Sequence, residues 1–158
     1  TAIANWMHHI REDKVPFLNG DGENRRDMLH VSDAVSANVF AMNYDGLFSG
    51  KSYDIGTGDN ISLNEVIKIV HDYFPNVKFE KRPPRKGDVL LTRAKTSDFE
   101  KFGWQTKIKI QEGINSCFSN LKKYKMGKGR SNLRNQSYET RWVGESNLLM
   151  FKWLSKKY

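Results

Sequence analysis

This sequence is short of cysteine and of long apolar runs, and it contains no internal repeat. Its single cysteine, Cys117, excludes a disulfide within the chain and is typical of proteins from a reducing compartment. No apolar run is long enough to serve as a secretory leader or to span a membrane. Thr1 leads directly into a helical pattern, so we expect a processed or cut chain. Together these features predict a cytoplasmic protein without a membrane partner.

An excess of positive charge is also missing from most of the chain. Residues 1–119 hold 16 Lys and Arg against 16 Asp and Glu, whereas residues 120–158 hold 10 against 2. The net charge of +8 therefore comes from the end of the chain. Helical periodicity fades after residue 122 as well. We expect a domain at residues 1–122 and a basic extension at residues 123–158.

The basic extension carries aromatic residues between its cations, namely Tyr138, Trp142, Phe151 and Trp153. Such a pattern suits the stacking platforms of proteins that bind single-stranded nucleic acid. However, a nucleic-acid-binding protein spreads its charge over one face of the fold, and cations scattered along a terminal extension are more often solvated. We therefore do not expect nucleic acid to be a partner.

Strand and helix patterns alternate along residues 1–121, which predicts an α/β fold. The expected strands are residues 16–18, 28–31, 52–55 and 77–80. The expected helices are residues 1–13, 32–44, 62–74, 96–102 and 110–121. Ser62 and Glu65 have the spacing of a capping box at the start of the third helix, and an apolar stripe follows them.

The turn at residues 20–28 is the feature around which we interpret the chain. Two glycines bracket an aspartate at residues 20–22, and this composition predicts a tight turn. Arg25 and Arg26 follow at once, and a planar charged fork at this place suits the binding of a phosphate through two contacts. A hairpin turn with solvated charges is the alternative.

Further motifs follow this turn in order. They are Val31-Ser32-Asp33, residues 53–58, Arg85-Lys86-Gly87-Asp88, Gly103-Trp104 and Glu112-Gly113. In order and in spacing, the set resembles the C-terminal part of the NAD-dependent epimerase/dehydratase family over residues 2–121. That family consists of extended short-chain dehydrogenases that act on sugar nucleotides, among them 4-epimerases, 4,6-dehydratases and decarboxylases.

The resemblance implies a small mixed-sheet substrate lobe of an extended short-chain dehydrogenase, with the Rossmann half absent from this chain. In this family, residues matching Arg26 and Arg85 hold the diphosphate of the substrate, and the aspartate matching Asp88 contacts the ribose. The strand that ends at Leu18 and Asn19 lines the base pocket. The implied partners are a nucleotide diphosphate sugar and an N-terminal Rossmann half, with a homodimer as a further assembly. A salt bridge that pins the loop of Arg85 and Asp88 is the alternative.

Several features of the family are missing. The sequence has no G-x-x-G-x-x-G loop for NAD, and Gly56-Thr57-Gly58 lacks the third glycine and the distal acidic residue of a dinucleotide motif. Tyr124 and Lys128 have the spacing of the catalytic Tyr-x-x-x-Lys. Gly127 and Gly129 should break the helix that would align them, so we interpret this match as chance.

Smaller departures concern single positions. Lys95 stands where the family usually has aspartate and Thr106 where it usually has proline, which affects the expected loop conformations only. The adjacent His8 and His9 point about 100° apart on a helix and cannot chelate a metal together. We expect no catalytic, cofactor-binding or metal-binding residue in this chain.

The function implied by the resemblance is the substrate-binding part of an NAD-dependent sugar-nucleotide epimerase or dehydratase. NAD, held by the missing half, would transiently oxidise the sugar before epimerisation, dehydration or decarboxylation. We expect the chain alone to be inactive. The alternative is a non-catalytic sugar-nucleotide or partner-binding module from a split gene, with a basic tail that binds an anionic surface.

Overall fold

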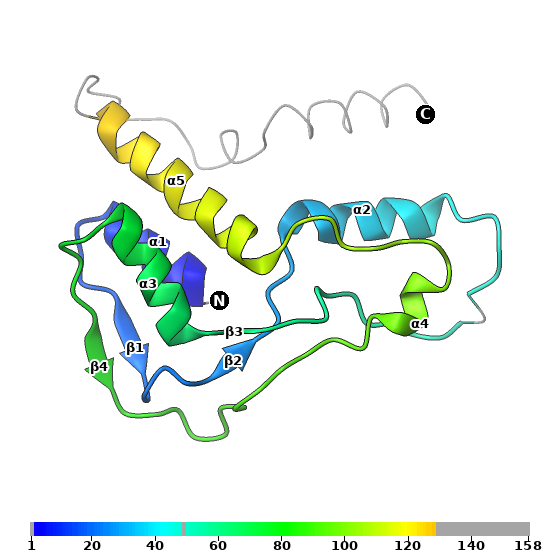
Figure 1. The fold of residues 1–158 in the computed structure, drawn as a ribbon, viewed down its shortest axis with the longest axis horizontal. Coiled ribbons are helices and arrows are strands. Elements are labelled where there is room, and N and C mark those ends of the chain that lie inside the picture. The colour runs from blue at the N-terminus through cyan, green and yellow to red at the C-terminus, as the bar shows by residue number, and fades with distance from the viewer. Residues whose placement is uncertain (1, 49, 129–158) are drawn as a thin grey trace. The chain divides into compact units, whose positions relative to one another are not determined.

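The computed structural model describes residues 2–48 and 50–128. Along these ranges Figure 1 shows, in order, α1 (Ala2–Arg11), β1 (Phe17–Asn19), β2 (Arg25–Arg26), α2 (Val31–Met42), β3 (Ile61–Ser62), α3 (Leu63–Tyr73), β4 (Glu80–Arg82), α4 (Ser97–Glu100) and α5 (Ile110–Lys128). Thr1–Lys125 form one compact unit. Of the predicted basic extension, residues 129–158 lie outside the described ranges. Among the helices that are described, none is long and apolar enough to cross a membrane.

The strands form two sheets of two strands each. β1 and β4 pair in parallel with Asn19 opposite Arg82, and β2 and β3 pair antiparallel with Arg25 opposite Ser62. Arg25 also forms a parallel bridge with Leu91. The chain from β1 to β2 therefore lies beside the chain that follows β4, although more than 50 residues separate them.

Helices α1, α3 and α5 bury their apolar stripes in what we call the main core. Its buried members are Trp6, Ile10, Leu18, Ile61, Val66, Val70, Ile110, Ile114, Phe118 and Leu121. The predicted capping box of α3 is confirmed, because Ser62 Oγ accepts from Glu65 N at 3.1 Å and Glu65 Oε2 accepts from Ser62 N at 2.9 Å. The main core thus fixes the start of α3, which supports the turn before β2.

A second cluster lies around α2 and α4, and we call it the aromatic cluster. Its members are the buried Ala37, Phe99 and Trp104 and the partly buried Leu29, Phe40, Ala41, Phe48, Tyr53, Ile55 and Phe102. On α2 the small-residue face carrying Ala37 is the buried one, whereas Val39 and Met42 are exposed. The aromatic cluster holds α2 through alanine contacts that allow close packing.

Two of the predicted strands are wrong. Residues 28–31 form no strand because β2 ends at Arg26 and α2 begins at Val31. Residues 52–55 form none because no segment of the described chain pairs with them, and their apolar side chains Tyr53 and Ile55 pack in the aromatic cluster instead. The strand predicted at 77–80 lies later, at β4, because the ladder with β1 begins at Glu80.

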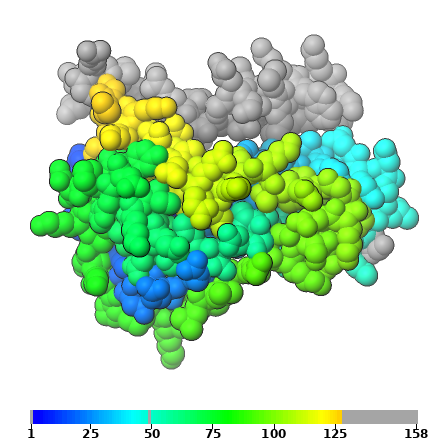
Figure 2. Space-filling model, viewed as in Figure 1, coloured from blue at the N-terminus to red at the C-terminus, as the bar shows by residue number. Residues whose placement is uncertain are grey.

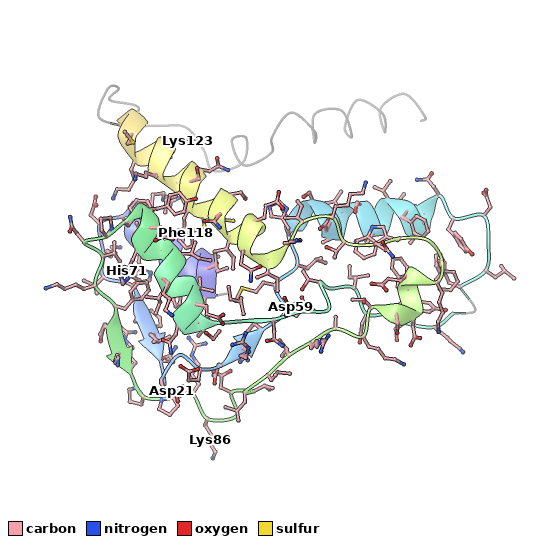
Figure 3. All side chains as sticks on the ribbon, viewed as in Figure 1. Asp21, Asp59, His71, Lys86, Phe118 and Lys123 are labelled. Atoms are coloured by element: carbon pink, nitrogen blue, oxygen red, sulfur yellow. The ribbon has the colours of Figure 1, made fainter. Side chains whose placement is uncertain are left out.

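The predicted helix ends also need correction. The first four helices are all shorter than predicted, whereas α5 continues through Gly127 to Lys128. The prediction that Gly127 breaks this helix is wrong, because one glycine costs only about 1 kcal/mol in a helix interior. Positions 124 and 128 therefore share one face of α5. Figure 3 shows Lys123, in this part of α5, on the opposite side of the fold from Asp21 and Lys86.

Candidate functional site

The turn before β2 is held by the first turn of α3. Gly20 and Gly22 have φ values of 75° and 85°, and Asp21 Oδ1 accepts from the backbone N–H of Glu23 at 3.0 Å. Asn64 N donates to Gly22 O at 3.0 Å, and Asn64 Nδ2 donates to Asp21 O at 3.0 Å. A Cβ on Gly22 would lie 2.2 Å from Asn64 Oδ1, so only glycine fits there. Figure 2 shows the turn, in blue, exposed between green atoms of neighbouring segments.

The two adjacent arginines point in different directions, as successive residues of a strand do. Arg25 is committed to the fold: its Nε donates to Asn60 Oδ1 at 2.6 Å, and its Nη1 pairs with Glu65 Oε2 at 2.9 Å. Arg26 instead pairs with Asp88, with 2.6 Å between Nη2 and Oδ1. Of the pair, Arg26 is the one that faces the loop after β4.

Residues 85–88 form a turn that carries two of the predicted site residues. Asp88 N donates to Arg85 O at 3.2 Å, and Gly87 takes a φ of 78° that favours glycine. Backbone hydrogen bonds fix the following segment to β2, because Arg25 N donates to Leu90 O at 2.7 Å and Thr92 N donates to Arg25 O at 3.1 Å. The turn is thus presented by a firmly attached loop.

Asn19 lies beside Arg85 at the end of β1. With the Asn19 amide oxygen facing the guanidinium, it accepts from Arg85 Nε at 3.1 Å and from Nη2 at 3.2 Å. Gly20 N also donates to Arg82 O at 2.9 Å, which holds the two segments together. Asn19 and Arg85, and Asp88 and Arg26, therefore form two side-chain pairs joined by the hydrogen bond from Asp88 N to Arg85 O, and we call the four residues the polar cluster, although the sequence spreads them over some 70 positions.

Leu18 differs from the other predicted site residues because its side chain belongs to the main core. It also lines a hollow of about 760 Å³ between α3 and the segment at residues 75–81, together with Asn64, Ile67 and His71. Among the described residues, the salt bridge of this loop joins Asp88 to Arg26, so a loop-pinning salt bridge of the kind weighed as the alternative is present at Asp88.

The sequence did not identify Asn24 as part of this cluster. Asn24 Nδ2 donates to Asp88 Oδ2 at 2.7 Å, so both carboxylate oxygens of Asp88 accept hydrogen bonds from residues beside β2. Asn24 and Asn64 act through side-chain contacts over more than 40 positions, for which the sequence offers no local signal.

The carboxylate of Asp27 accepts hydrogen bonds from the Gly56–Gly58 loop. Its Oδ1 accepts from Thr57 N at 2.9 Å and from Thr57 Oγ1 at 2.7 Å, and its Oδ2 accepts from the N–H groups of Gly58 and Ala94 at 3.1 Å. A Cβ on Gly56 would lie 2.4 Å from Ala94 Cβ. This loop does not fit the diphosphate of NAD, because its N–H groups already bind a carboxylate that would repel phosphate.

Asp33, at the start of α2, is buried and joins α2 to the segment before α5. Its Oδ2 accepts from Thr106 Oγ1 at 2.7 Å and from the N–H groups of Ile108 and Lys107 at 2.9 and 3.1 Å. Burial raises the pKa of Asp33, but these hydrogen bonds and the nearby His30 outweigh it and hold the pKa below its ordinary value. The hydroxyl of Thr106, where the family usually has proline, therefore stabilises this junction.

The other position that departs from the family pattern, Lys95, lies beside α4. Lys95 pairs with Asp98 of α4 at 3.0 Å. In the ranges that the structure covers, no group of three or more His, Cys, Asp or Glu side chains could hold a metal ion. The polar cluster around Arg26 is thus the candidate site.

Comparison with known proteins gives consistent matches. The model of the NAD dependent epimerase/dehydratase family matches residues 1–56. The chain is 35% identical to UDP-glucose 4-epimerase of Mycolicibacterium smegmatis over 114 residues, which are 71% of this chain and 36% of the relative. It is 34% identical to UDP-N-acetyl-alpha-D-glucosaminuronate decarboxylase of Bacillus cytotoxicus over 107 residues, covering 59% of this chain and 33% of the relative.

A solved structure with the same fold is UDP-glucose 4-epimerase from Thermotoga maritima with UDP-glucose. It matches with a TM-score of 0.68 and 26% identity, over 78% of this chain and 40% of that chain. The chain spans about a third of the length of the curated relatives it matches. Its relatives are thus enzymes that modify sugar nucleotides.

Proposed function

We propose that this chain is the C-terminal, substrate-binding part of an NAD-dependent enzyme that modifies a nucleotide-activated sugar. Residues 1–122 would form the lobe that binds the sugar nucleotide, and residues 123–158 a basic extension. The observation that carries the proposal is the polar cluster from Asn19 through Arg85 and Asp88 to Arg26. Within it, Asp88 is linked to both arginines, because its side chain pairs with Arg26 and its N–H donates to Arg85 O.

Two guanidinium groups suit a diphosphate because each can make paired, charge-assisted hydrogen bonds with fixed geometry. A guanidinium has five N–H donors. In its contacts with described residues, Arg26 uses one N–H on Nη1 and one on Nη2. Arg85 uses the N–H on Nε and one on Nη2. Each side chain thus keeps donors for a ligand, and we assign both to the diphosphate.

The remaining assignments follow from position. A carboxylate can accept hydrogen bonds from two ribose hydroxyl groups, so we assign Asp88 to the ribose. We assign the strand end at Leu18 and Asn19 to the base. NAD would be held by a Rossmann half outside this chain, since the Gly56–Gly58 loop does not fit it. The chain's own residues bind and orient the substrate, and we assign no bond-making step to them.

The same geometry fits a second candidate, a non-catalytic sugar-nucleotide-binding module. The Gly56–Gly58 loop, whose N–H groups bind Asp27 rather than staying open to a cofactor, is compatible with both candidates. The two candidates share the diphosphate site and differ in turnover. Adding the Rossmann half of a relative should produce turnover only for the enzyme.

Calorimetric titration of the whole chain with UDP-glucose at fixed salt tests the site. Arg26→Ala and Arg85→Ala should each weaken binding by about 1.5–3 kcal/mol, or roughly ten- to hundred-fold. Lysine at either position should restore little, because it keeps the charge and loses the fork. The double variant should be non-additive, since both side chains act on one group.

Lys86→Ala is the matched control, because Lys86 is an exposed cation of the same turn. It should leave the affinity within about two-fold, as expected for a screened surface charge. The assignment fails if the wild-type chain does not bind UDP-glucose. It also fails if both arginine variants keep the wild-type affinity while circular dichroism shows an intact fold.

A further inference from the structure

We propose that Asp88 exchanges partners when a nucleotide binds. In the free protein it neutralises Arg26, and on binding it releases Arg26 to the diphosphate while its carboxylate turns to the ribose. This inference rests on the proposed function and deepens it, because it states how the site would distinguish a nucleoside diphosphate from a bare diphosphate.

The ion pair between Arg26 and Asp88 occupies the place assigned to the diphosphate. Arg26 Nη2 and Asp88 Oδ1 are 2.6 Å apart, and the two side chains are only 25% and 32% exposed. Solvent therefore screens the pair less than it screens a fully exposed pair. An anion that approaches Arg26 meets the negative charge of Asp88 at the same place.

Asn24 holds Asp88 in this position. Its amide Nδ2 donates to Asp88 Oδ2 at 2.7 Å, and its own backbone oxygen accepts from Leu63 N at 3.3 Å at the start of α3. Asn24 precedes Arg26 by two positions, and both side chains reach the same carboxylate. Asn24 is thus a positioning residue that acts on Arg26 through Asp88.

The carboxylate can be released without moving the backbone. Asp88 N is fixed in the turn by Arg85 O, and the chain just after it is fixed by the hydrogen bond from Arg25 N to Leu90 O. Both contacts of the carboxylate are made by side chains, so rotation of the Asp88 side chain alone breaks them. The backbone then keeps Asp88 beside the site.

The exchange makes the site selective. Inorganic pyrophosphate would take Arg26 but would leave the Asp88 carboxylate without a partner beside a polyanion, which is unfavourable. A nucleoside diphosphate offers ribose hydroxyl groups that replace the hydrogen bonds lost by Asp88. The ion pair therefore disfavours bare diphosphate and tolerates the nucleotide.

Binding of pyrophosphate and of UDP to the whole chain tests this by calorimetry at fixed salt. Asp88→Asn should strengthen pyrophosphate binding about three- to five-fold, which corresponds to loss of a partly exposed ion pair, and weaken UDP binding about ten-fold. Asn24→Ala should shift both affinities in the same directions by smaller factors. Asp21→Asn is the control, since it removes the same charge from the neighbouring turn and should change neither affinity more than about two-fold.

The outcomes separate the two proposals. The proposed function is overturned if UDP does not bind the wild-type chain, or if Arg26→Ala binds UDP as tightly as the wild type does. If UDP binds through Arg26 but Asp88→Asn weakens both ligands or changes neither, only the partner exchange is wrong. In the free chain, phenylglyoxal should modify Arg26 faster in Asp88→Ala and Asn24→Ala than in the wild type. Equal rates by mass spectrometry would show that the ion pair does not hold Arg26 in solution.

Discussion

In the main core, side chains from α1, α3 and α5 are almost completely buried, and Val66, Val70 and Phe118 have no exposed surface. Most rings of the aromatic cluster keep part of their surface exposed, and among its members only Ala37, Phe99 and Trp104 are buried. Apolar neighbours of the aromatic cluster, such as Met42 and Leu47, are 75% and 90% exposed.

The two regions are therefore held together differently. The main core is built largely from the amphipathic helices α1, α3 and α5, so its stability comes mainly from apolar burial. The aromatic cluster includes irregular chain at residues 48–55 and 102–104 and depends on single polar contacts. The clearest are Asp33 with residues 106–108 and Trp104 Nε1, which donates to Ser36 Oγ at 3.0 Å. Where burial is incomplete, polar joints determine the packing.

The largest expected changes in the free energy of unfolding come from removing a buried ring in each of the two regions. Phe118→Ala should lower the free energy of unfolding by about 3–5 kcal/mol, because it leaves a cavity at a fully buried site. Phe102→Ala removes the same ring from a partly buried position of the aromatic cluster and should cost about 1–2 kcal/mol. Urea denaturation followed by circular dichroism measures both. Equal losses would mean that the aromatic cluster is as tightly packed as the main core.

The next effect concerns the polar joint at Asp33. Asp33→Ala leaves the Thr106 hydroxyl and two N–H groups without their acceptor and should cost about 1–3 kcal/mol at neutral pH. Because the folded pKa lies below the ordinary value, the carboxylate stabilises the fold above about pH 3.9 and loses this effect as the pH falls through the folded pKa.

Urea denaturation of Asp33→Ala and wild type at several pH values measures this dependence. The difference between them should shrink as the solution is made acidic. Asp54→Ala, an exposed aspartate near the same cluster, is the control and should stay within about 0.5 kcal/mol of wild type. A difference for Asp33→Ala that does not change with pH would contradict an ionised Asp33.

Much of the main core could be predicted from the sequence, because its signals are local. The box of Ser62 and Glu65 and the stripe from Ile110 to Leu121 depend only on helical spacing. The absence of a strand at residues 52–55 could not be predicted from local signals. Alternating apolar and polar residues show that one face of a strand could be buried, but not that a partner strand exists. The end of α5 lies beyond the predicted residue 121, because apolar periodicity fades there while the helix itself continues through polar residues to Lys128.

For the candidate site, the sequence indicated charged residues but not their contacts. The residue types alone do not distinguish Arg25 from Arg26, and only the resemblance points to Arg26; strand geometry commits Arg25 to Asn60 and Glu65. Asp27, which follows Arg26 in the turn at residues 20–28, is a structural residue whose carboxylate holds the Gly56–Gly58 loop. Such roles depend on pairing between segments that are distant in the sequence, which no local pattern contains.

The smallest expected losses of stability compare the two regions most directly, because each variant removes one serine hydroxyl. Ser62→Ala removes the cap of α3 and should cost about 1 kcal/mol, because the Glu65 N–H at the helix start loses its acceptor. Ser36→Ala removes the hydroxyl that accepts from Trp104 Nε1 and donates to Asp33 O at 2.9 Å. Trp104 is buried, so its N–H would lack a partner, and the cost should be about 1–2 kcal/mol.

Both values come from urea denaturation at neutral pH, with unchanged m-values as the check that each variant unfolds in the same way. A Ser36→Ala loss equal to or greater than that of Ser62→Ala supports the view that single polar contacts hold the aromatic cluster. A negligible loss at Ser36 would show that its rings pack well enough without them.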